Sequence, residues 1–177
     1  MNIVFNSESI NDFKAIRNNS IITHIGNNFF SQEAVNSVLA KIEQIDLTPH
    51  GYKLNKEYGW SMDKINHTIP LYQKWLAIQV IYEDLSFAPS SLIDEFWHAH
   101  ILDTKKYYKD CIEICGHMIH HYPYFGLTDH ETEKDLEAGF ELTKKLFEYH
   151  FGINSLGYNS KEAASCGCRS GNGSSCR

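Results

Sequence analysis

The sequence has no apolar run of about 18 residues, so no membrane-spanning helix is predicted. Its first residues lack a basic segment followed by an apolar one, so we expect no secretory signal and a cytoplasmic, reducing location. Glycine-rich nucleotide loops and the GxSxG nucleophile elbow are missing, which argues against nucleotide cofactors and the common nucleophile-elbow hydrolases. Basic residues are also scarce: 16 lysines and arginines oppose 22 acidic residues, a formal charge of −6. We therefore expect neither a nucleic acid nor a membrane as partner.

Histidine is the residue present in excess. The 177-residue chain has ten, and six of them lie between positions 98 and 130. Imidazole titrates near neutral pH and is the commonest metal ligand in proteins. The composition therefore indicates this window as the candidate functional site.

Hydrophobic residues at three- and four-residue spacing predict an all-α fold, a compact bundle of about four helices. The first predicted helix begins after Ser31 and ends at Pro49, and the second runs from Leu71 to Leu85. The third runs from Ser91 to Cys115, and the fourth begins at a capping box of residues 128–131 and ends at Phe151. Residues 50–66, which follow the first of these helices, are predicted to form a loop.

The helical domain is expected to cover residues 31–156, between an N-terminal arm (1–30) and a tail (157–177). The tail is rich in glycine and serine, has almost no apolar residue and is predicted to be disordered. Its cysteines at positions 166, 168 and 176 suit a soft metal, a redox pair, covalent modification or no role at all. The alternative to a site in the domain is thus a non-catalytic binding module or folded leader, in which the histidines are structural and the tail is the functional segment. Its partner would be an unidentified protein or peptide.

His98 and His100 lie on the predicted third helix but cannot bind the same ion. Two residues along a regular helix turn the side chain by about 200°, so these imidazoles flank the inward face on opposite sides. His98 shares its flank with Asp94, whereas His100 leans towards Trp97. A metal site must therefore use one flank or the other.

A second histidine group follows Gly116, where the chain is predicted to turn. If this segment is helical, His117, His120 and His121 lie on one face. Folding back, the group could complete a site of zinc or iron type. The candidate ligands are His98, His100, His120, His121, Asp94 and Cys111. The pair that we expect most is His100 with His121, and an enzyme built on it would use metal-activated water or oxygen.

A purely structural interpretation explains the same residues. Trp97 and its neighbouring histidines could form a buried hydrogen-bonded network, and Asp94 fits the capping box that begins at Ser91. Cys111 and Cys115 lie four residues apart on the inward face and are expected to be buried thiols. The sequence leaves a metal site and a polar network as alternatives, so whether the protein is an enzyme stays open.

This stretch also carries a resemblance to a known family. The residues concerned are Asp94, Trp97, His98, His100, Ile101, Leu102, Asp103, Thr104, Tyr107, Asp110 and Cys111, followed by Gly116, His120, His121 and Pro123. Over roughly residues 65–152 the pattern resembles the glycine-rich domain-containing protein-like family. The resemblance implies a helical domain and no particular reaction. Plant members of that family carry long glycine-rich extensions, whereas this chain has only its short tail.

Overall fold

The computed structural model describes residues 29–129 and 131–157, in which helices are joined by loops and no strand is present. The helices are α3 (Gln32–Ile42), α4 (Thr48–Tyr58), α5 (Met62–Ile81), α6 (Ser91–Leu102), α7 (Thr104–Cys115) and α8 (Glu133–Phe151). The all-α prediction is confirmed, but these six helices replace the four expected. None of them has the length and apolar character needed to cross a membrane. Nearly all of the predicted arm and tail, including the three tail cysteines, lies outside the described residues.

Helix α4 occupies most of the predicted loop at residues 50–66. Pro49 lies in its first turn, where the missing amide hydrogen is not needed, so this proline begins a helix and does not close one. Gly51 lies inside α4, and a Cβ added there would come 2.8 Å from the Cγ2 atom of Ile65 on α5. The glycine therefore allows α4 and α5 to pack closely, and the helix ends at Gly59 in a left-handed conformation (φ 69°).

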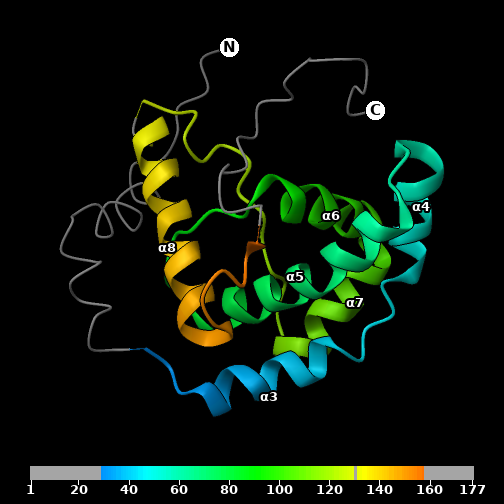
Figure 1. The fold of residues 1–177 in the computed structure, drawn as a ribbon, viewed down its shortest axis with the longest axis horizontal. Coiled ribbons are helices and arrows are strands. Elements are labelled where there is room, and N and C mark those ends of the chain that lie inside the picture. Colours follow the sequence, from blue (N-terminus) through cyan, green and yellow to red (C-terminus); the bar gives the residue numbers. More distant parts are fainter. Residues whose placement is uncertain (1–28, 130, 158–177) are drawn as a thin grey trace.

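Helix α5 begins nine residues before the predicted start at Leu71. Ser61 caps it, because the Ser61 hydroxyl accepts a hydrogen bond from the Lys64 amide. The helix then continues through Pro70, which removes one backbone hydrogen bond without ending it. Trp75, fully buried near the middle of α5, packs edge to face against Phe87 and Trp97. This packing makes α5 the central element of the core (Figure 1).

The predicted third helix is two helices that meet at Asp103. The Asp103 backbone leaves the helical region (ψ 68°), and its carboxylate accepts a hydrogen bond from the Lys106 amide at the start of α7. Aspartate is a favoured N-cap because its side chain binds an otherwise unpaired amide. Gly116 ends α7 in a left-handed conformation (φ 83°), as predicted.

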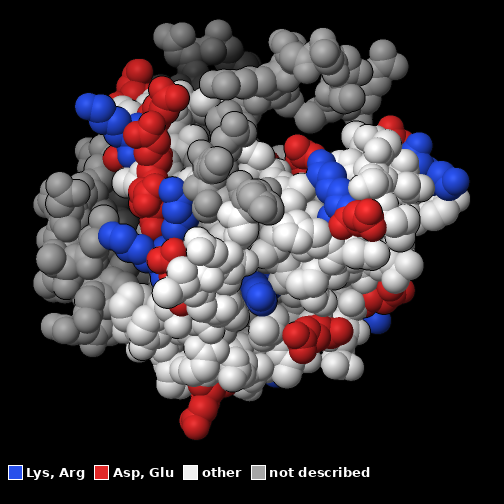
Figure 2. Space-filling model, viewed as in Figure 1, with Lys and Arg blue, Asp and Glu red and all other residues white. Residues whose placement is uncertain are grey.

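Helix α8 lies along one side of the molecule and α4 at the opposite end (Figure 1). It begins after Thr132, whose amide binds the Asp135 carboxylate, so the capping box lies four residues beyond the predicted one. The predicted inner residues of α8 are all buried: Leu136, Phe140, Thr143 and Phe147. Charged side chains of both signs run along its outer face (Figure 2). Helix α8 therefore packs through one face and exposes the other to solvent.

Candidate metal centre

Asp94 is held in the first turn of α6, but it does not cap the helix. The cap is Ser90, whose hydroxyl accepts from the Ile93 amide and whose carbonyl accepts from the Asp94 amide. Ser91, the expected cap, is the first helical residue. The capping role expected for Asp94 is therefore wrong, and its buried carboxylate is left to contact side chains.

His98 lies one helical turn after Asp94, on the flank predicted for it. Its Nδ1 atom is 3.5 Å from Asp94 Oδ2, and 44% of its side chain is exposed. Residues four apart lie on the same face of a helix, so this pair follows directly from the spacing.

His121 reaches the same carboxylate from the loop between α7 and α8. Its Nε2 atom is 3.1 Å from Asp94 Oδ1, and its ring centroid is 4.6 Å from that of Trp97 and 4.6 Å from that of His98. Residues 117–123 are not helical, so the predicted common face of His117, His120 and His121 does not form. His117 instead pairs with Glu83, 3.1 Å away, and His120 is exposed.

Tyr107 of α7 holds this loop against α6. Its hydroxyl accepts a hydrogen bond from Trp97 Nε1 (2.9 Å) and donates one to the carbonyl of Ile119 (2.6 Å). Burial raises the pKa of Tyr107 far above its usual range, so the hydroxyl keeps the proton that it donates. Since Ile119 lies two residues before His121 and Trp97 packs on the His121 ring, these bonds position the imidazole.

Asp94, His98 and His121 together form a group that could hold a metal ion. One ligand atom from each residue can be chosen so that all three lie within 4.8 Å of one another. Bonds of about 2.1 Å that meet at 90–109° place neighbouring ligand atoms about 3.0–3.4 Å apart. The separations of 3.5 and 3.1 Å between Asp94 oxygens and the two imidazoles are close to that range. A metal ion would compete with protons for these ligand atoms.

One of the comparisons with known proteins identifies a family. A family model described as UCP032817-like matches residues 51–150, more than half of the chain. The chain belongs to the UCP032817-like family. This match corrects the predicted resemblance to the glycine-rich domain-containing protein-like family, which drew on a short histidine-rich stretch within residues 65–152. No curated protein and no solved structure matches the chain.

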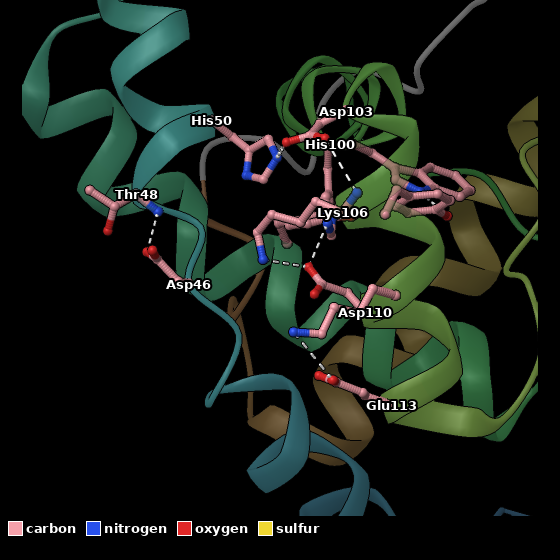
Figure 3. A network of polar contacts seen from close by, with 12 residues as sticks. Asp46, Thr48, His50, His100, Asp103, Lys106, Asp110 and Glu113 are labelled. Atoms are coloured by element: carbon pink, nitrogen blue, oxygen red, sulfur yellow. Dashed lines mark hydrogen bonds and ion pairs between the residues drawn. The ribbon is translucent and has the colours of Figure 1, made fainter.

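In this UCP032817-like protein, His100 belongs to a separate polar network between α4, α6 and α7 (Figure 3). Its Nε2 donates to Asp110 (2.9 Å), which Lys106 also contacts, so its Nδ1 accepts from the Tyr72 hydroxyl (2.8 Å). Burial, aided by the nearby His50, lowers the pKa of His100 to about 4, and the ring is therefore neutral. The expected pairing of His100 with His121 does not form.

His50 is a buried member of this network that the sequence did not indicate. Its ring centroid is 4.6 Å from that of His100, and neither of its nitrogens has a hydrogen-bond partner within the described chain. Its nearest carboxylate, Asp103, lies 3.8 Å from Nε2. Burial and then the Lys106 charge lower the pKa of His50. Residues 50–66 were predicted to form a loop, where a histidine is expected to be exposed, so His50 was not recognised as a buried residue.

Cys111 lies outside the Asp94 group. It is buried, and this burial raises the pKa of its thiol, which opposes the thiolate form that metals bind. The thiol of Cys115, partly buried, donates to the Cys111 carbonyl. The expectation of buried thiols therefore holds for Cys111, whereas Cys115 is only partly buried.

A cavity of about 520 Å³ adjoins the Asp94 group of the UCP032817-like protein. Asp94 and His121 line it, together with the end of α5, the α5–α6 connection, the loop after α7 and the start of α8. Glu131 also lines it, held by a bridge in which its backbone exchanges hydrogen bonds with Thr128. Its Oε2 atom is buried and has no hydrogen-bond partner within the described residues. The volume suits a small organic molecule.

Proposed function

We propose that the protein binds a divalent transition metal of zinc or iron type through Asp94, His98 and His121. The observation that carries this proposal is the convergence of these three side chains, two from α6 and one from the loop between α7 and α8, with ligand atoms within 4.8 Å of one another. Two imidazoles and one carboxylate are a ligand set used for Zn²⁺ in hydrolytic sites and for Fe²⁺ in oxygen-activating sites. Three protein ligands leave positions for water or substrate.

The cavity adjoins two of the three proposed ligands. Asp94 and His121 line it, whereas His98 does not and is close to half exposed. A molecule in the cavity would therefore reach the ion from the side of Asp94 and His121. This arrangement favours chemistry on a bound organic substrate, with the metal activating water or oxygen.

Titration of Zn²⁺ and Co²⁺ into the untagged, metal-free full-length chain tests the proposal. We expect one ion per site and an absorption spectrum of the Co²⁺ form typical of nitrogen and oxygen ligands. Replacing Asp94 by Asn should weaken binding by about 100-fold or more, since even the loss of an outer contact costs 10–100-fold. A companion chain with serine at positions 166, 168 and 176 separates this site from the tail thiols.

His120→Gln is the matched control. It removes an imidazole next to His121, but one that is exposed and outside the Asp94 group, so the affinity should stay within about twofold of the original. His121→Gln should behave like Asp94→Asn. Equal Zn²⁺ affinity in the His120 and His121 variants would overturn the proposal, as would a lack of Zn²⁺ and Co²⁺ binding in the serine-substituted chain.

A further inference from the structure

The wall of the cavity beside the Asp94 group is rich in carboxylates. Among the described residues its lining includes four carboxylates, Glu83, Asp84, Asp94 and Glu131, and the imidazoles of His117, His120 and His121, but no lysine or arginine. Glu83 is paired with His117, and Asp94 with His98 and His121. A carboxylate or phosphate ligand would meet four carboxylates with no lysine or arginine beside them, so the lining favours neutral or positively charged molecules.

Glu131 supplies a specific contact for a cation. Its Oε2 atom is buried at the cavity wall with no hydrogen-bond partner in the described structure, and an unsatisfied buried carboxylate oxygen is costly. The Thr128 bridge fixes the backbone of Glu131, and the Tyr122 hydroxyl hydrogen-bonds to its side chain, while Oε2 stays without a partner. A ligand that donates hydrogen bonds to Oε2 would remove this cost.

The rest of the wall is largely apolar. Phe87 comes from the α5–α6 connection, Ile119 and Phe125 from the loop after α7, and Leu136 from α8. Such surfaces favour a hydrocarbon body, while a few polar groups fix the orientation of the ligand.

We propose that this cavity binds an organic amine, with its ammonium group on Glu131 and its apolar body against Phe87, Ile119 and Phe125. The ammonium group brings three donors and a positive charge to a carboxylate that has an oxygen to spare. That such an amine is also the substrate of the metal rests on the function proposed above. The ammonium contact itself requires no metal.

Three probes of equal chain length, hexylamine, 1-hexanol and hexanoate, test the proposal on the metal-free full-length chain. Calorimetric or NMR titration at neutral pH should find that hexylamine binds at least about tenfold more tightly than hexanoate, with hexanol between them. Glu131→Gln should reduce the affinity for hexylamine to about that for hexanol. Glu133→Gln, an equivalent change at an exposed residue near the start of α8, should leave all three affinities unchanged.

Hexanoate binding as tightly as hexylamine would overturn the proposal, and so would a Glu131→Gln chain that keeps the amine preference. Thermal unfolding of each variant verifies that the fold is retained. The metal and amine titrations fail separately: amine preference without Zn²⁺ uptake contradicts only the proposed metal site. Zn²⁺ uptake without amine preference contradicts only the amine site.

Discussion

At the scale of single residues, the hydroxyl of Tyr107 has the widest consequences around the Asp94 group. It joins Trp97 of α6 to the Ile119 carbonyl in the loop, and all three residues are buried. Removing it leaves a buried indole N–H and a buried carbonyl unpaired, each costing about 1–3 kcal/mol. It also releases the loop that carries His121. Tyr107 is therefore a positioning residue for the proposed metal site.

Tyr107→Phe should lower the free energy of unfolding by at least about 2 kcal/mol and weaken Zn²⁺ binding about tenfold. Urea unfolding and Zn²⁺ titration at a temperature where the variant is fully folded measure the two effects. Tyr108→Phe is the matched control, because that side chain is 58% exposed. Equal Zn²⁺ affinity in the two variants would show that the hydroxyl does not position His121.

The sequence predicts one flank of this site and leaves the other undetermined. Helical geometry separates His98 from His100 and puts His98 beside Asp94, and the structure has both features. The flank to which His121 returns depends on the hydrogen bond between Tyr107 and Ile119, which joins residues from different elements. Periodicity within one helix contains no information about such a contact. The pairing of His100 with His121 was wrong for that reason.

At the scale of helices, the wrongly predicted helix boundaries involve residues whose effect on a helix depends on their position in it. Proline ends a helix when it lies inside but begins one when it lies in the first turn, as Pro49 does in α4. Asp103 could lie mid-helix, yet it caps α7. The long apolar patterns, such as the inner face of α8, were predictable because burial alone determines them.

Gly51→Ala tests whether close packing explains the glycine in α4. Alanine favours a helix over glycine by about 1 kcal/mol, but its Cβ would overlap Ile65 Cγ2, and overpacking costs about 1–3 kcal/mol. We expect a net loss of about 1 kcal/mol in urea unfolding. Ile65→Leu removes the Cγ2 branch that the new Cβ would overlap. Gly51→Ala should therefore cost less stability in a chain that already carries Ile65→Leu than it does in the original chain. A Gly51→Ala chain more stable than the original would contradict this explanation.

At the scale of the whole molecule, buried neutral histidines link stability to pH. Burial lowers the pKa values of His50 and of His150, which lies between Tyr82 and Gln32. When the pH falls through the unfolded value near 6.5, the unfolded chain takes up protons that the folded chain resists. The stability is therefore complete above that pH and is lost below it. Each such histidine contributes about 1.4 kcal/mol per pH unit until its folded pKa is reached.

His50→Leu measures the contribution of His50 to this pH dependence of stability. His50 faces Asp103, Asp110 and Asp46 as well as Lys106 and His100, and burial and then Lys106 outweigh the three carboxylates, so its pKa is lowered. Leucine has a similar volume, and neither imidazole nitrogen has a hydrogen-bond partner to lose, so the variant should be as stable as the original chain at pH 7.5. At pH 5.5 it should be more stable by about 1 kcal/mol, because the unfolded state binds one proton fewer. Urea unfolding of the metal-free chains at both pH values measures the difference. Parallel loss of stability in the two chains between pH 7.5 and 5.5 would mean that His50 takes up its proton as readily in the folded protein as in the unfolded one.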